Sequence, residues 1–355
     1  MLLCRPTGCS VLERRVTRIG HRKKHHQESH TMNRLLPLFC LALLAGANAS
    51  AEPNVLLGAH VGSQHDPRSK EKFEAFEKLI GRKLTIDNDH EDWALFPDVD
   101  RVKWNRANGR RSMLSWRIVF QRSDPSKGCA TADAINAGTY DDQLRKQAEQ
   151  VKALGGPPIL VRYNYEMSNN QENTCFTGFK VKTNLPLAGT KYIAAWKHVV
   201  DIFRKVGATN VEWVFAPGHN AYISGEWKQF YPGNDYVDWI GIDNYNKSNQ
   251  AKSFATDPGM LAFYAATSGM GKPLMVAETG AVSDPKKNPD PQTLWLQTAR
   301  EFLKTHPQIK AFLWWQNAGK LKKEDRSYEG SGYELQGSGL DAFKAMATDP
   351  HFANK

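Results

Sequence analysis

The sequence predicts an α/β fold in which eight parallel strands and their helices close into a single-domain (β/α)8 TIM barrel. First, 355 residues with 41% hydrophobic and 24% charged side chains can bury one large core, which excludes wholesale disorder and a small disulfide-stapled scaffold. Second, apolar runs of strand length alternate with longer segments of helical period. Third, no Gly-x-Gly-x-x-Gly turn follows any of these runs, so an open doubly wound sheet has less support than a closed barrel.

The expected elements follow one another in strand-then-helix order. The expected strands, all short and rich in Val, Ile, Leu, Trp or Tyr, are Val55–Val61, Lys83–Asp87, Met113–Val119, Ile159–Tyr165, Val211–Ala216, Trp239–Tyr245, Leu274–Thr279 and Ala311–Gln316. The expected helices are Lys70–Leu79, Asp141–Leu154, Tyr192–Val206, Pro258–Thr267 and Pro291–Thr305. Gly155, Gly207 and Gly271 stand between a helix and the next strand, where glycine commonly ends a helix.

The positive charge of the chain is concentrated at its N-terminus. Residues 1–51 hold eight Lys or Arg and two acidic residues, so they carry +6 of the formal net charge of +10. The remaining 304 residues carry +4 and show no basic stripe. This leaves little surface for neutralising phosphates, so nucleic-acid binding is not expected.

The same N-terminal segment has the pattern of a secretory signal that begins at Met32. A short basic start is followed by the apolar run from Leu35 to Leu44 and by the small-residue sequence Ala49-Ser50-Ala51. The apolar run is about half the ~20 residues that a bilayer-spanning helix needs, so stable membrane insertion is not expected. We therefore expect residues 1–51 to be a cleaved leader, 52–355 to form the barrel, and the protein to be secreted or periplasmic. An uncleaved anchor is the alternative, and residues 1–31 reflect either an early start codon or a long basic region.

Two cysteines, Cys129 and Cys175, remain beyond the expected leader. In an oxidising compartment an even pair predicts one disulfide, and two unrelated free thiols are the alternative. Neither these cysteines nor the histidines and carboxylates fall at ligand spacing, so we expect no metal site and no cofactor. A monomer is expected.

Polar and aromatic residues gather at the ends of the expected strands, which is where (β/α)8 barrels build their sites. Glu166 follows the fourth strand and Glu278 lies near the end of the seventh, each beside Trp or Tyr residues. These two strands lie on opposite sides of a barrel, so the two carboxyl groups can face each other across a sugar, as glycoside hydrolysis requires. The alternative for each glutamate is a helix cap or an ion pair with arginine.

Three segments are similar to glycoside hydrolase family 26, the β-mannanase-like branch of the clan A barrels. They are Arg162–Ser168 (RYNYEMS), Tyr231–Asp243 (YPGNDYVDWIGID) and Lys272–Gly280 (KPLMVAETG). The resemblance runs in order from about Val55 to Phe343. It implies a polysaccharide-cleaving enzyme that retains anomeric configuration by double displacement, with Glu166 as the acid/base and Glu278 as the nucleophile.

The resemblance also implies that Tyr245 lies beside the nucleophile and that Trp315 forms the floor under the reacting sugar. From the residues alone, Trp116 either stacks on a sugar or fills the core. His60 and Asp89 are candidates for binding sugar hydroxyls. Arg162 is a candidate for the same role or for a buried ion pair. The mechanism requires an ionised Glu278, which a hydrogen bond from Tyr245 would favour, and a protonated Glu166, whose pKa apolar surroundings or an anionic Glu278 would raise.

Two departures from the family pattern bear on the substrate. Tyr165 stands where the family usually has histidine, and residues 168–171 (SNNQ) lack the aromatic side chain that typical mannanases carry after the acid/base. The substrate therefore stays open between a mannan, a mixed-linkage glucan and a bacterial exopolysaccharide. A transglycosylase of the same fold and a non-catalytic carbohydrate-binding barrel remain the alternatives to a hydrolase.

Overall fold

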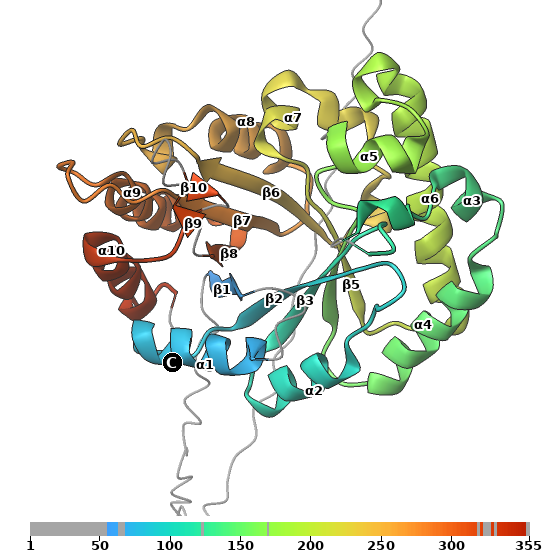
Figure 1. Cartoon of the computed structure of the whole chain (residues 1–355), viewed down its shortest axis with the longest axis horizontal. Helices are drawn as coiled ribbons and strands as arrows, with labels where there is room; N and C mark the ends of the chain where they lie inside the picture. Colours follow the sequence, from blue (N-terminus) through green and yellow to red (C-terminus); the bar gives the residue numbers. More distant parts are fainter. Residues whose placement is uncertain are drawn as a thin grey trace, which may run out of the picture. The chain divides into compact units, whose positions relative to one another are not determined.

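The protein folds as a closed barrel of eight parallel strands with helices around it (Figure 1). The computed structural model describes residues 55–62, 68–121, 124–168, 170–317, 320–321, 328–329 and 332–352. The expected leader, residues 1–51, lies outside them. Each strand pairs with the next, and β1 closes the ring by pairing with β8, with Leu56 opposite Ala311 and Val61 opposite Gln316. The (β/α)8 fold predicted from the sequence is confirmed.

Every expected strand is present, and the second differs most from its predicted bounds. The strands are β1 Leu56–Val61, β2 Ile86–Glu91, β3 Arg111–Trp116, β4 Ile159–Tyr163, β5 Val211–Phe215, β6 Trp239–Asn246, β7 Leu274–Ala281 and β8 Ile309–Gln316. A small separate sheet pairs β9 Lys320–Leu321 with β10 Tyr328–Glu329. Strand β2 begins at Ile86 and continues through the polar residues Asp89, His90 and Glu91, all of them buried. Polar residues are rare in buried strands, so the sequence pattern alone ended this strand too early.

All five predicted helices are present, and the structure adds others. The helices are α1 Ser69–Ile80, α2 Val99–Ala107, α3 Ala132–Asn136, α4 Asp141–Leu154, α5 Asn170–Thr177, α6 Leu185–Val206, α7 His219–Ser224, α8 Pro258–Thr267, α9 Pro291–Thr305 and α10 Gly337–Thr348. Helices α4, α8 and α9 have their predicted bounds. Helix α6 begins earlier than predicted, where the Asn184 side chain accepts a hydrogen bond of 3.2 Å from the Leu187 amide and Pro186 occupies the first turn. No helix in the described ranges is both long and apolar enough to cross a membrane.

Helix α2 was not predicted, because the residues that it buries are mostly polar. Arg101 and Asn105 are buried together with Val102. The Arg101 guanidinium donates to Asp87 at 2.6 and 3.0 Å, and Asn105 donates to the same carboxylate at 2.8 Å. These contacts fix α2 against β2, so the start of α2 lies beside the polar end of that strand.

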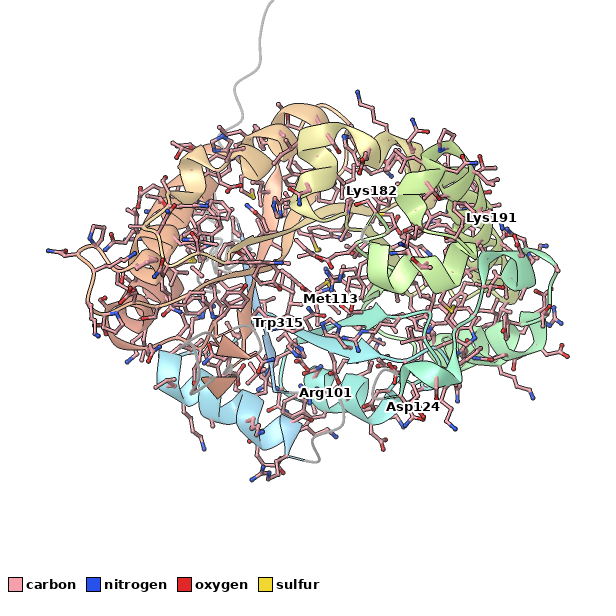
Figure 2. The ribbon with its side chains drawn as sticks, turned by 45° about the horizontal axis from the view of Figure 1, so that its top comes forward. Arg101, Met113, Asp124, Lys182, Lys191 and Trp315 are labelled. Atoms are coloured by element: carbon pink, nitrogen blue, oxygen red, sulfur yellow. A yellow bond between two sulfur atoms is a disulfide. The ribbon has the colours of Figure 1, made fainter. Side chains whose placement is uncertain are left out.

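Away from the polar ends of the strands, the barrel interior is filled by apolar side chains. A cluster contributed mainly by the strands includes Ile86, Met113, Leu160, Val214, Met275 and Leu313, all nearly or fully buried. Figure 2 labels Met113 within the ring of strands. Because this cluster blocks the interior, a ligand can enter the barrel only at the polar ends of the strands.

Cys129 and Cys175 form a disulfide with a Cα–Cα distance of 6.2 Å, which confirms the predicted pairing. Cys129 lies in the loop that follows β3, and Cys175 lies in α5, the helix that follows Glu166. The bond therefore links the loop that follows β3 to the helix that follows β4, both beyond the polar ends of their strands.

Candidate active site

Glu278 lies on β7 with 6% of its surface exposed, and donors from three other strands surround its carboxylate. Arg162 on β4 donates to Oε1, and the Tyr245 hydroxyl on β6 donates to Oε2 at 2.7 Å. His90 on β2 places Nε2 3.4 Å from Oε1. Burial alone would raise the pKa of Glu278, but Arg162, His90 and Tyr245 hold the pKa well below its usual range. The carboxylate is therefore ionised at neutral pH.

Arg162 is fully buried and paired with two carboxylates, so the structure supports the ion-pair role for it rather than direct sugar binding. Its Nη1 lies 2.7 and 2.6 Å from the two oxygens of Asp243 on β6. Its Nε donates to the Ser115 hydroxyl at 2.9 Å, and the Tyr165 ring centroid lies 3.7 Å from its central carbon. This geometry fixes the nitrogen that reaches Glu278.

Tyr245 makes the predicted contact with Glu278 and is itself held by stacking. Its ring lies parallel to that of Tyr333, with centroids 5.0 Å apart. Burial, and then the charge of Glu278, raise the pKa of Tyr245 well above its usual value. The hydroxyl therefore keeps its proton and serves as a donor to the carboxylate.

Glu166 follows β4 in an unusual backbone conformation. Its φ is 50° and that of Asn164 is 38°, in the left-handed region that non-glycine residues seldom adopt. The Glu166 amide donates to the Ala216 carbonyl at 2.9 Å, which fixes this turn to the chain after β5. Backbone strain of this kind is concentrated at functional sites. The hydrogen bond to Ala216 therefore fixes the backbone at Glu166 in this conformation.

The Glu166 side chain lines a cavity of about 310 Å³ together with Tyr245 and Asp243. The other residues around this cavity are Ser168, Lys182, Gly218, His219, Asn220, Glu226 and Lys247. Tyr245 also donates to Glu278, so one tyrosine lines the cavity of Glu166 and contacts the predicted nucleophile.

Three aromatic rings from β1, β2 and β8 meet beside Glu278. His60 stacks on Trp315 with ring centroids 4.1 Å apart, and His90 meets the same indole edge-on at 5.0 Å (Figure 2 labels Trp315). The His60 Nδ1 lies 2.9 Å from the Asn88 carbonyl oxygen, and burial lowers the pKa of this histidine. Trp315 is only partly buried. These contacts fix the orientation of its ring.

The structure does not support a contact between Trp116 and a sugar. This side chain is fully buried, and its ring stacks between Phe96 and Trp93 at centroid distances of 4.1 and 4.9 Å. Its indole nitrogen donates to the Trp93 carbonyl at 3.2 Å. Trp116 therefore fills the core between the barrel and its outer layer, which is the alternative that the sequence left open.

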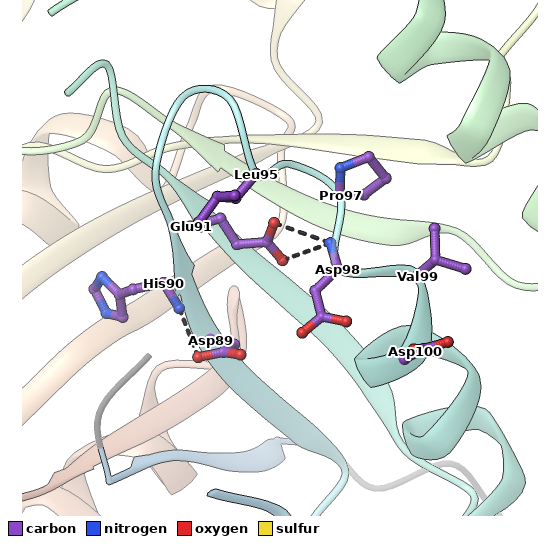
Figure 3. Close-up of a pocket in the computed structure, with 8 residues that line it drawn as sticks. All are labelled: Asp89, His90, Glu91, Leu95, Pro97, Asp98, Val99 and Asp100. Carbon is purple, nitrogen blue, oxygen red and sulfur yellow. Dashed lines mark hydrogen bonds between the residues drawn. The ribbon is translucent and has the colours of Figure 1, made fainter. Parts of the chain in front are cut away.

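Asp89 and His90 both line a second cavity, of about 380 Å³ (Figure 3). Glu91, Asp98 and Asp100 add three more carboxylates, and both oxygens of Glu91 accept the Asp98 amide at 2.9 Å. Asp89 itself is 8% exposed and accepts the His90 amide at 2.9 Å. Burial outweighs the charge of Arg101 and raises the pKa of Asp89 to about 7.

Replacing Asp89 by asparagine is expected to stabilise the protein at alkaline pH and to leave its stability at pH 4 nearly unchanged. An ordinary aspartate ionises near pH 4, whereas folded Asp89 stays protonated until about pH 7, so the wild-type protein loses stability as the pH rises between these values. Asparagine has no charge to bury, and each unit of pKa shift corresponds to ~1.4 kcal/mol. Thermal unfolding at pH 4, 6 and 8 measures this. An equal melting-temperature difference at all three values would contradict it.

Several residues that contact the predicted nucleophile or support its neighbours were not predicted from the sequence. His90, Asp243, Arg117 and Ser115 belong to this group, and Tyr165 was noted only as a departure from the family. One signal was present in the sequence: four consecutive polar residues, Asp87 to His90, interrupt an apolar strand pattern. In the described part of the chain, no three His, Cys, Asp or Glu side chains are grouped so that they could hold a metal ion.

Comparisons with known proteins group this sequence with carbohydrate-active enzymes. Residues 83–282, more than half of the chain, match the family model of glycosyl hydrolase family 26. Endoglucanase H of Acetivibrio thermocellus is 33% identical over 234 residues, which are 62% of this chain and 24% of that protein. A mannan endo-1,4-beta-mannosidase of Bacillus subtilis is 29% identical over 127 residues, 35% of this chain and 31% of that protein. The matched regions thus span about a quarter and a third of these two relatives.

Solved structures share the fold at low sequence identity. A β-mannanase from Bacteroides ovatus superposes with a TM-score of 0.59 at 18% identity, over 84% of this chain and 90% of that one. The catalytic domain of an endo-beta-1,4-mannanase from Bacillus sp. JAMB-750 gives a TM-score of 0.61 at 16% identity, over 86% and 88% of the two chains. At these identities the likeness establishes the barrel architecture.

Proposed function

This chain belongs to glycosyl hydrolase family 26, and from that premise we propose that it is a retaining glycoside hydrolase that cleaves a β-linked polysaccharide within its chain. The observation that carries the proposal is the environment of Glu278. A buried carboxylate with donors on both oxygens, and a pKa held low by Arg162, is ionised and oriented, as a nucleophile must be.

In the proposed first step, a Glu278 oxygen attacks the anomeric carbon while the bond from that carbon to the glycosidic oxygen breaks. Glu166 gives its proton to the departing oxygen, and a glycosyl ester of Glu278 forms. In the second step, Glu166 takes a proton from water, the water oxygen attacks the same carbon, and Glu278 leaves as a carboxylate. Two inversions restore the original configuration.

The contacts of Glu278 fit a nucleophile that must give up charge. Each carboxylate oxygen has two lone pairs, so an oxygen that accepts one hydrogen bond can still attack. Arg162 is also paired with Asp243, so it stays neutralised when Glu278 becomes an ester. The buried site is therefore not left with an unpaired positive charge during the reaction.

The two cavities suggest where the polymer lies. The cavity that contains Glu166 would hold the leaving-group side of the polymer, and the one that contains Asp89 and His90 would hold the other side. Trp315 offers an apolar ring face to the reacting sugar, and His60 and Asp89 offer polar contacts beside it. We also propose that residues 1–51 are a removed leader and that residues 52–355 act outside the cytoplasm, in keeping with the Cys129–Cys175 disulfide.

The proposal is tested with soluble β-mannan, mixed-linkage β-glucan, β-xylan and the exopolysaccharide of the source organism, each scored for new reducing ends. We expect hydrolysis of at least one, with the β-anomer formed first when the products are followed by proton NMR. An α-anomer as first product would contradict the retaining mechanism. Calorimetric binding without new reducing ends would identify a carbohydrate-binding barrel, and longer oligosaccharides at high acceptor concentration would identify a transglycosylase.

A further inference from the structure

We propose that Arg117, braced by Tyr165, fixes His90 as the neutral imidazole with its proton on Nε2, and that His90 in this form positions the carboxylate of Glu278. Arg117 is thus a positioning residue two contacts away from the reacting carbon. The inference rests on the proposed role of Glu278 as the nucleophile, but its central claim concerns the location of one proton and can be measured without substrate.

The three side chains form a closed, buried set of contacts. The Arg117 Nη2 lies 2.7 Å from His90 Nδ1, and its Nε donates to the Tyr165 hydroxyl oxygen at 2.8 Å. The Tyr165 oxygen in turn lies 2.9 Å from His90 Nδ1. His90, Arg117 and Tyr165 are 2%, 6% and 8% exposed, so water does not replace these contacts.

The chemistry of arginine determines the tautomer of His90. A guanidinium group has only N–H donors and keeps its charge at any pH that the protein survives, so Nδ1 must accept its hydrogen bond with a lone pair. A neutral histidine then carries its proton on Nε2. That nitrogen lies 3.4 Å from Glu278 Oε1 and has no hydrogen-bond partner within the described residues, so its contact with the carboxylate is electrostatic. The partial positive charge of this N–H therefore lies beside the carboxylate.

The groups that face His90 keep it neutral. They come from five different strands or the segments that follow them: Glu278, Arg117, His60, Tyr165 and Trp315. Burial, and then the charge of Arg117, lower the pKa of His90 well below its usual value, although Glu278 acts in the opposite direction. A neutral histidine orients Glu278 without adding a second full positive charge beside Arg162. Such a charge would stabilise the carboxylate further and make it a weaker nucleophile.

Tyr165 explains how both arginines are held in place. Its ring packs against the guanidinium of Arg162, and its hydroxyl accepts from Arg117. One side chain therefore braces the cation that binds Glu278 directly and the cation that acts through His90. The phenol is long enough to span both contacts at the position where the family resemblance suggests histidine.

The experiment is ¹⁵N NMR of the full-length chain labelled at histidine, with the His90 signals assigned by their loss in His90→Gln. We expect a pyrrole-type Nε2 and a pyridine-type Nδ1 that stay unchanged between about pH 5 and pH 8. Arg117→Met should make His90 titrate in this range, because the repelling charge is gone. It should also lower kcat by about 10- to 100-fold, as loss of a supporting hydrogen-bond partner commonly does, with KM changed less.

Three further variants distinguish a positioning role of Arg117 from a general loss of structure. Tyr165→Phe should keep the tautomer, because Arg117 still donates to Nδ1, and should lower kcat less. Arg117→Lys restores a fixed charge and should keep His90 from titrating. Arg111→Met removes an arginine of the same strand region whose partner is Glu212, away from Glu278, and should leave the His90 signals and kcat unchanged.

A wild-type spectrum with the proton on Nδ1 would overturn the proposal. So would an Arg117→Met protein whose His90 signals and kcat match those of the wild type. If Arg117→Met does not fold, the wild-type spectrum and Arg117→Lys decide the question. A chain that hydrolyses no polysaccharide but shows the expected tautomer would contradict the proposed function and not the assignment of the proton.

Discussion

Glu278→Ala is expected to lower kcat for an activated aryl β-glycoside by on the order of 10⁵-fold or more, the loss that follows removal of a covalent nucleophile. Without the Glu278 oxygen no glycosyl ester can form. Arg162, Tyr245 and His90 then surround an empty space rather than a carboxylate. The measurement is release of the aryl group under saturating substrate, with thermal unfolding as the check that the variant is folded.

A small anion provides the positive control for this variant. Azide should enter the space left by the carboxylate and attack the anomeric carbon directly, which restores aryl release and yields a glycosyl azide of inverted configuration. Glu71→Ala, which removes an exposed glutamate on α1, serves as the matched variant and should keep full activity. Substantial activity of Glu278→Ala without azide would show that another residue is the nucleophile.

Glu166→Ala is expected to lower kcat for a polysaccharide by about 10²- to 10⁴-fold, the usual contribution of a general acid. A sugar hydroxyl is a poor leaving group and needs the proton, whereas a dinitrophenolate leaves without one. Ester formation from a dinitrophenyl glycoside should therefore proceed almost normally, and hydrolysis of the ester should become the slow step. The measurement is the ratio of the two rates.

The pH profile gives a second, independent measure of Glu166. In the wild type, kcat/KM should fall at alkaline pH as Glu166 loses its proton, and this alkaline limb should disappear in Glu166→Ala. Azide should here give a product of retained configuration, because it captures the ester on Glu278. An equal loss for both leaving groups, or an unchanged alkaline limb, would mean that Glu166 is not the acid.

The elements that the sequence predicted well are those whose signal is local. The bounds of α4 and α9 follow from apolar periodicity. Those of α8 follow from the residues at its start, where Pro258 is the first residue and Asp257 accepts the Gly259 and Met260 amides at 2.9 and 3.1 Å. Helix α2 and the second half of β2 were missed because their buried residues are polar. Burial of Arg101 makes sense only once Asp87 is known to lie within 2.6 Å.

The site residues also divide into those that had a local signal in the sequence and those that had none. Glu166 and Glu278 were predicted because each lies at or after a strand end, in a segment that resembles a family motif, and Tyr245 lies two residues beyond such a segment. Trp116 was assigned with an open alternative, because a tryptophan near the end of a strand can face either the barrel mouth or the surrounding helices, and its neighbours in space are Trp93 and Phe96. Nothing in the sequence pattern pointed to the contacts between Arg117, Tyr165 and His90.

By itself the sequence determined the barrel, the two carboxylates offered for catalysis and the presence of an even pair of cysteines. The tertiary structure alone decided which donors surround Glu278, that Arg162 is buried in an ion pair, and that Cys129 lies within bonding distance of Cys175. The physical reason is the separation along the sequence over which each kind of interaction acts. Periodicity and capping act over a few residues, whereas Arg162 and Glu278 are 116 positions apart and Arg117 and Tyr165 are 48 apart. Closure of the barrel brings such residues together, and burial there makes each of their contacts strong.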